Sequence, residues 1–305
     1  MLMSEDKEKY VILHVEGGLG KNVAGTAIVK PLAEKYPDRK LIVCCSWPEI
    51  FYHNPNIYRV YGLGSPYFYD NYIKDKDSII LRREPYFEST HIMQKTPLMQ
   101  TWFSMYGLKF DEHKHKPNIE LNMYGEQAHH RWNVPEKPVL VLQTNGGPFF
   151  DDQQQNVYSW ARDMPYTVAT AVAEEAFKKN YHVFQVCRPN SPTINGAEIV
   201  NQQMSNMELF GILKAAKKRL LIDSCLQHAA AAFNLPSTVL WVGTHPEMFG
   251  YKLHNNIKCN QPKGISHLLN SMYFDYDLAS HPHECPFKNE TEIFNTQKII
   301  NSLKL

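Results

Sequence analysis

The chain has no apolar run of the length that crosses a membrane, since a spanning helix needs about 20 consecutive apolar residues. It also lacks an apolar leader, because the segment from Met1 to Lys7 is charged rather than apolar. Neither sign of charge dominates: 32 lysines and arginines stand against 31 aspartates and glutamates, so nonspecific binding to phosphate polymers is not expected to dominate. We therefore expect a cytoplasmic protein with no integral membrane segment.

Cysteine is too scarce and too irregularly spaced for a disulfide framework, with six residues in the chain. Cys44, Cys187 and Cys259 lie in strand-like runs and are expected to be free thiols. A cluster from His281 to Cys285, with His267 upstream, has none of the spacings of a standard zinc finger. We accordingly expect no metal site and no cofactor.

Strands and helices alternate in both halves of the chain, which predicts an α/β fold of two domains. In the first half, Tyr10–Val15 is predicted to be a strand and Asn22–Tyr36 a helix. In the second half, Pro138–Gln143 and Tyr181–Cys187 are predicted strands on either side of a helix over Tyr166–Lys179. We expect an N-terminal domain over 1–130, a C-terminal domain over 131–285 and a final helix within 286–305.

A polar elbow follows Arg219–Ile222, a short run typical of a strand buried in a parallel sheet. Asp223 and Ser224 come at its carboxyl end, where open α/β sheets hold their ligands, and either can cap the Ala-rich helix that follows. The free N–H groups and the dipole of such a helix start favour a phosphate, and His228 lies one turn further on. The alternative is that Asp223 and Ser224 only cap the helix and that His228 is a packed side chain.

A glycine-rich turn, Glu16–Gly20, follows the first strand, but it is neither of two well-known phosphate loops. A Walker loop would need Gly at position 15 and Ser or Thr at position 22, where this chain has Val15 and Asn22. A dinucleotide fingerprint that starts at Gly18 would need a small residue where Val23 stands. The turn therefore opens a Rossmann-type βα unit without either fingerprint.

Three segments together resemble the nucleotide-sugar signature of the ADP-heptose:lipopolysaccharide heptosyltransferase family, glycosyltransferase family 9. They are Asp223–His228, with the sequence Asp-Ser-Cys-Leu-Gln-His, then Asn234–Pro236 and Gly243–Gly250. One departure is Cys225, which stands where that family usually has Gly. The resemblance implies the GT-B architecture, in which two Rossmann-like domains face each other across a cleft. It places the donor in the C-terminal domain and the acceptor in the N-terminal domain, with the last helix packing back across the hinge.

The resemblance also implies which residues meet the donor. Thr144 and Asn145 match a pair of Thr residues, and Arg162 matches a Lys, that contact the donor's phosphates in the family. Arg188 ends a strand where the ribose hydroxyls would lie. Met204 lies where the base would rest, although a methionine at helical spacing is also typical of a core. The expected donor-binding residues are Thr144, Asn145, Arg162, Arg188, Met204, Asp223, Ser224, Cys225 and His228, with Gly17, Gly18 and Gly20 in the glycine loop.

The chain departs furthest from that family at the catalytic residue. The family's loop has Asp, its proposed base, directly after Gly, whereas here Gly20 is followed by Lys21. A protonated lysine is a poor base. Glu16, at the end of the first strand, is the expected substitute for taking a proton from an acceptor hydroxyl. Alternatively Glu16 caps the next helix or pairs with Lys21, and Asp151 and Asp152 are either acceptor contacts or solvated loop residues.

We expect an inverting glycosyltransferase that moves a hexosyl, heptosyl or pentosyl group from a nucleotide-diphosphate sugar to a hydroxyl without a metal. The leaving diphosphate would be stabilised by Arg162, by the helix start at Ser224 and by His228. The acceptor would be a saccharide or a lipopolysaccharide-type molecule. Two alternatives stay open: a virus-type DNA glycosyltransferase that modifies a hydroxymethylated base, and a catalytically silent sugar-nucleotide-binding protein. The sugar, the nucleotide and the oligomeric state also stay open.

Overall fold

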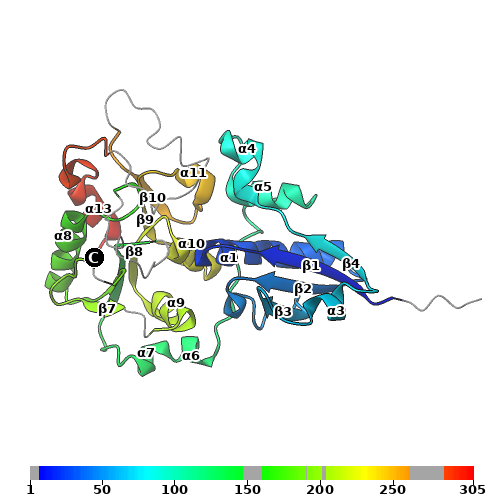
Figure 1. Ribbon diagram of the computed structural model, residues 1–305. Coiled ribbons are helices and arrows are strands. Elements are labelled where there is room, and N and C mark those ends of the chain that lie inside the picture. Colours follow the sequence, from blue (N-terminus) through cyan, green and yellow to red (C-terminus); the bar gives the residue numbers. More distant parts are fainter. Residues whose placement is uncertain (1–6, 147–159, 190, 201–203, 262–284) are drawn as a thin grey trace, which may run out of the picture. The chain divides into compact units, whose positions relative to one another are not determined.

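The computed structural model describes residues 7–146, 160–189, 191–200, 204–261 and 285–305, and its contacts divide the chain into two units (Figure 1). Unit 1 holds Met1–Glu88 and Leu98–Glu120, and unit 2 holds Ser89–Pro97 and Leu121–Leu305. The chain thus leaves unit 1 at Glu120, so residues 121–130 of the expected N-terminal domain lie in unit 2. Ser89–Pro97 also lies in unit 2, an exchange that no pattern in the sequence indicates.

Unit 1 is built on a four-stranded parallel sheet with the order β3-β2-β1-β4. The strands are β1 (Lys9–Val15), β2 (Lys40–Cys45), β3 (Arg59–Gly62) and β4 (Asp77–Leu81). The central strand β1 is buried along most of its length, as expected for a strand covered on both faces. The strand order reverses between β1 and β4, and the carboxyl ends of strands at such a reversal are where open α/β sheets bind their ligands.

The helix expected over Asn22–Tyr36 forms as two helices joined by a 3₁₀ turn. These are α1 (Leu19–Gly25), η1 (Thr26–Ile28) and α2 (Val29–Lys35). Gly25 allows close packing at the join, because a Cβ there would lie 2.9 Å from the ring of Trp102 on α5 (Leu98–Met105). Unit 1 also contains η2 (Pro48–Ile50), α3 (Phe68–Tyr72) and η3 (Pro85–Phe87).

Unit 2 is built on a six-stranded parallel sheet with the order β10-β9-β8-β5-β6-β7. The strands are β5 (Val139–Gln143), β6 (His182–Val186), β7 (Glu198–Val200), β8 (Lys218–Ile222), β9 (Thr238–Trp241) and β10 (Asn255–Lys258). Every side chain of β5 is buried, in keeping with its central place. Counted from β5, this is the strand order of the doubly wound Rossmann fold, and the reversal falls between β5 and β8.

Helices cover both faces of the unit 2 sheet (Figure 1). On one face lie α8 (Tyr166–Lys178) and α13 (Thr296–Leu303), which pack on each other, and on the other lie α9 (Asn206–Ala215) and α10 (Cys225–Ala232). The short helices of unit 2 are α4 (Ser89–Ile92), α6 (Met123–Glu126), α7 (Ala128–Arg131), α11 (Pro246–Phe249) and η4 (Glu290–Glu292). Residues 121–131 join this unit because α6 packs tightly on α9: a Cβ on Gly211 would overlap the carbonyl oxygen of Gly125. Both units are therefore α/β units of Rossmann type, as the sequence predicts.

Candidate functional site

Polar residues gather at the carboxyl ends of the central strands of unit 2, where the strand order reverses. Thr144, Asn145 and Gly146 follow β5, and Asp223 and Ser224 follow its neighbour β8. The two loops touch: a Cβ on Gly146 would lie 2.9 Å from the Ser224 Oγ. Such switch points are where open α/β sheets bind their ligands. The structure thus places next to each other two segments that the sequence analysis had identified separately.

Arg162, in the loop before α8, joins this group. Its Nε donates to the backbone carbonyl of Asp223 over 2.7 Å. Its two Nη groups have no hydrogen-bond partner among the residues that the structure describes. Because Nε is fixed by this bond and both Nη groups remain available, the guanidinium is suited to bidentate binding of a phosphate.

Asp223 carries a half-buried carboxyl group in the site. Its Oδ2 accepts a hydrogen bond of 2.5 Å from the hydroxyl of Thr244, which follows β9. Burial raises the pKa of Asp223, while the charge of Arg162 and the bond from Thr244 act in the opposite direction. Thr244 was not among the predicted residues, although its position directly after Gly243 at a strand end could have marked it.

Asp163 is a second residue that the sequence did not single out. Its fully buried carboxylate accepts from the N–H of Gly146 over 3.3 Å and forms an ion pair with Arg188. Arg188, which was predicted to contact the ribose, thus forms an ion pair with Asp163 and stabilises the loop around it. The signal that could have found Asp163 is its position directly after Arg162.

The start of α10 differs from its prediction in one respect. Ser224 is the N-cap residue, but its side chain makes no capping hydrogen bond, so the expected cap is wrong for this residue. Its extended backbone, with φ −159° and ψ −174°, points the hydroxyl toward Gly146 instead. The first N–H groups of α10 are consequently not capped by Ser224. Burial raises the pKa of the adjacent Cys225 thiol, which makes that thiol a neutral group.

His228 is buried and neutral. Burial lowers its pKa to about 3, with further lowering from His254 and Arg162. Its Nδ1 lies 2.8 Å from the hydroxyl of Tyr251, and the two rings meet edge to face. His228 therefore brings no positive charge to a diphosphate and can offer only one N–H of a neutral ring. Tyr251 was not among the predicted residues, although it directly follows the Gly243–Gly250 segment.

The glycine loop of unit 1 is shaped by its own hydrogen bonds. Gly17 has φ +92°, a value that favours glycine. Its N–H donates to Ser46 over 3.1 Å, and its carbonyl accepts from Trp47 over 3.1 Å and from the buried Asn22 over 3.3 Å. Gly18 is the N-cap residue of α1, and Gly20 lies within that helix. The loop therefore fixes the turn after β1 and does not present Gly17 N–H to a ligand.

Two ion pairs lie at the switch point of unit 1. Glu16 Oε1 accepts from Arg82 Nε over 3.0 Å and from Nη2 over 2.7 Å, and these bonds hold the pKa of Glu16 below its usual value. Lys21 pairs with Glu84. The alternative pairing of Glu16 with Lys21 is therefore wrong. The lowered pKa also makes Glu16 a weaker base than the sequence suggested, and Glu84 was not predicted.

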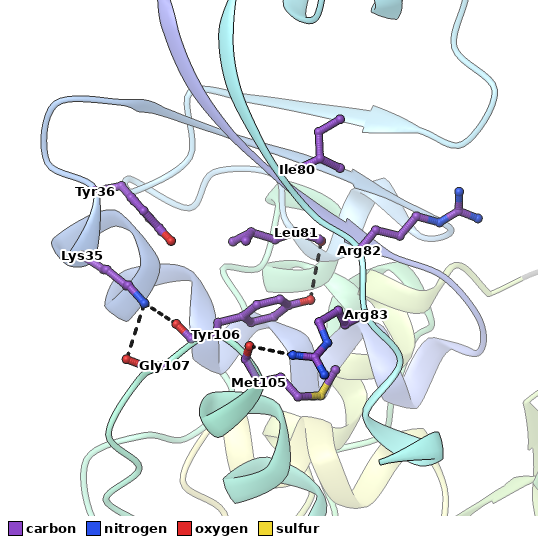
Figure 2. Close-up of a pocket in the computed structure, with 9 residues that line it drawn as sticks. All are labelled: Lys35, Tyr36, Ile80, Leu81, Arg82, Arg83, Met105, Tyr106 and Gly107. Atoms are coloured by element: carbon purple, nitrogen blue, oxygen red, sulfur yellow. Dashed lines mark hydrogen bonds between the residues drawn. The ribbon is translucent and has the colours of Figure 1, made fainter.

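Unit 1 also contains a cavity of about 380 Å³ beside β4 (Figure 2). Lys35 donates to the carbonyls of Tyr106 and Gly107, and Arg83 donates to that of Met105 over 3.3 Å. Lys35 and Arg83 therefore bind the carbonyl groups at and just after the C-terminal end of α5. The cavity is lined by Lys35, Tyr36, Ile80, Leu81, Arg82, Arg83, Met105, Tyr106 and Gly107.

Three predicted residues remain, namely Met204, Asp151 and Asp152. Met204 is partly exposed and precedes the capping box of Ser205 and Glu208 that starts α9. Asp151 and Asp152 lie outside the described residues.

The sequence holds two Asp-x-Asp triplets, Asp75–Asp77 and Asp275–Asp277, a spacing that metal-dependent glycosyltransferases of another fold use. Asp77 forms an ion pair with Arg39, 2.8 Å away, which lowers its pKa. The second triplet and most of the His281–Cys285 cluster lie outside the described residues. Within the part of the chain that the structure describes, no three His, Cys, Asp or Glu side chains are grouped as metal ligands would be. In the same part, no helix combines the length and the hydropathy needed to span a membrane.

Neither a protein-family model nor a curated protein matches the chain. Solved structures match it in fold. The glycosyl transferase family 9 protein from Veillonella parvula DSM 2008 is 10% identical, with a TM-score of 0.63 over 99% of this chain and 97% of that one. The E. coli ADP-heptose lps heptosyltransferase II is 12% identical, with a TM-score of 0.62 over 97% and 98%. The E. coli heptosyltransferase WaaC with ADP is 14% identical, with a TM-score of 0.51 over 88% and 100%. The chain therefore has the fold of the GT-B glycosyltransferases, as predicted.

Proposed function

We propose that this protein is a glycosyltransferase that takes its sugar from a nucleotide-diphosphate sugar. The observation that carries the proposal is the site between β5 and β8, where the open fork of Arg162 lies beside Asp223 and the uncapped start of α10. A cation and a helix N-terminus at a Rossmann switch point are suited to a diphosphate. Similar folds support this proposal, since the WaaC structure contains ADP.

The proposed reaction is a single displacement that inverts the anomeric carbon. As the diphosphate leaves, negative charge grows on its oxygens, and the Arg162 fork gains charge-assisted hydrogen bonds to it. Thr144 and Asn145 add polar groups at the same edge of the sheet, while neutral His228 contributes a hydrogen bond rather than charge. The proposal needs no divalent ion for this step.

The acceptor is proposed to bind unit 1 through a saccharide hydroxyl. Exposed rings suit that role: Tyr67 is 74% exposed, Tyr69 62% and Phe87 64%. Such rings stack on sugars and on unstacked bases alike. A hydroxymethylated base in DNA is therefore the second candidate acceptor.

The experiment is turnover with a panel of ADP-, UDP- and GDP-linked sugars, ADP-heptose included, read as release of the nucleoside diphosphate. Slow release into water is expected for one member, and faster release when oligosaccharide is added. Faster release with hydroxymethylated duplex DNA would select the second acceptor. Binding of a sugar nucleotide without any release would support the silent binding protein instead.

A further inference from the structure

The Lys21–Glu84 ion pair lies where the strand order of unit 1 reverses. Lys21 is on α1, which follows β1, and Glu84 follows β4, the neighbouring strand beyond the reversal. Both residues therefore follow the carboxyl ends of the two strands between which the order reverses, the place where open α/β sheets bind their ligands. A carboxylate lies there even though the loop after β1 has a lysine at the position where the resembling family has its proposed base.

We infer that Glu84 is the general base that takes the proton of the acceptor hydroxyl, an inference that rests on the proposed glycosyl transfer. As the acceptor oxygen forms its bond to the anomeric carbon, its proton passes to a Glu84 oxygen. The bond from the anomeric carbon to the diphosphate breaks, and its electron pair leaves with the diphosphate. The protonated Glu84 then releases its proton to water, so each bond and charge is accounted for.

The contacts of Glu84 orient its carboxylate and leave acceptor capacity on both oxygens. Oε1 accepts from the N–H of Tyr86 over 3.3 Å, and Oε2 faces the ammonium of Lys21. Each carboxylate oxygen can accept about two hydrogen bonds, so one further bond per oxygen remains for a substrate hydroxyl. The side chain of Lys21 runs beside the glycine turn, since a Cβ on Gly17 would lie 3.6 Å from its Cδ.

Glu16, the base expected from the sequence, is engaged differently. One oxygen of Glu16 takes both bonds from Arg82 and lies 3.2 Å from His14. That pair is open to solvent, with side chains 67% exposed for Arg82 and 45% for Glu16, against 11% for Lys21 and 31% for Glu84. A planar, permanently charged guanidinium makes two bonds where an ammonium makes a point contact. Glu84 therefore has room for a further hydrogen bond on each oxygen and is also less exposed to water than Glu16.

The test compares Glu84→Gln with the matched variant Glu16→Gln, because both replace a paired carboxylate of unit 1 by an amide of the same shape. ADP binding is measured by calorimetry and ADP release from ADP-heptose by a coupled assay over a range of pH. Glu84→Gln is expected to bind ADP as the wild type does, to lose about 100-fold or more in turnover and to lose the rise of rate with pH. Glu16→Gln is expected to keep that rise and to lose far less.

A second variant separates catalysis from a purely structural ion pair. Lys21→Met combined with Glu84→Gln leaves no unpaired charge, and its thermal unfolding is compared with that of the wild type. If both variants unfold earlier but turn over fully, the ion pair is structural and the inference is overturned. Loss of turnover in Glu16→Gln alone overturns it too. A wild type that binds none of ADP, UDP and GDP and releases none of them from their sugars would instead contradict the proposed function, which is a distinct result.

Discussion

Thr244 donates its hydroxyl to Asp223 over 2.5 Å, so the ends of β9 and β8 are joined through a half-buried carboxylate. A buried acceptor that loses its donor keeps its desolvation cost, about 1–3 kcal/mol. Thr244→Val is therefore expected to lower the free energy of unfolding in urea by that amount. Thr244→Ser, which retains the hydroxyl, is the control and should lose much less. Equal losses in the two variants would show that the methyl group, not the hydrogen bond, matters.

The close approach of Gly146 to the opposite loop gives a prediction about packing. A Cβ on Gly146 would lie 2.9 Å from Ser224 Oγ and 3.2 Å from Arg162 Nε. Gly146→Ala should push these groups apart, costing roughly 1–3 kcal/mol of stability, and should weaken ADP binding. Gly18→Ala is the matched control, since no neighbouring atom lies within 4 Å of a Cβ there. Unaltered ADP affinity in Gly146→Ala would separate this loop from the ligand.

The buried imidazole of His228 predicts a pH dependence of stability. Its pKa is about 3 in the folded protein, against about 6.5 for an unperturbed histidine. The unfolded chain therefore binds the proton more readily. The stability from this group is complete above about pH 6.5 and is lost as the pH falls toward 3, at up to about 1.4 kcal/mol per pH unit. Urea unfolding of the wild type and of His228→Gln at about pH 7 and pH 5 should show a shallower loss in the variant, smaller by roughly 2 kcal/mol. Parallel losses would mean that His228 is not the titrating group.

The site in unit 2 could be predicted from the sequence because its residues follow strands. Asp223, Ser224 and Thr144 each end an apolar run, and carboxyl ends of parallel strands meet at one edge. Asp163 was not predicted: its position directly after Arg162 was its one signal in the sequence, and its burial and its partners Gly146 and Arg188 are visible only in the structure. Ser224 was predicted correctly as the residue before α10, yet the direction of its hydroxyl depends on Gly146, which is distant in the sequence.

The ion pairs of unit 1 were harder to predict, because their charges pair across two strands. Glu84 follows β4 and pairs with Lys21, 63 residues earlier in the chain. Glu16 was named from its position after β1, but its strength as a base depends on Arg82, which also follows β4. A sequence shows which charges follow a strand, whereas their pairing depends on which strands become neighbours.

The central claim is that the site between β5 and β8 binds a nucleoside diphosphate through Arg162, and calorimetric titration with ADP tests it most directly. The wild type is expected to bind ADP. Arg162→Gln should bind at least about tenfold more weakly, because the charge-assisted bonds to phosphate contribute about 1.5–3 kcal/mol. Lys298→Gln, which removes an exposed cation of α13, should bind as the wild type does. A wild type that binds none of ADP, UDP and GDP, or equal binding of the nucleoside diphosphate by Arg162→Gln, would contradict the account.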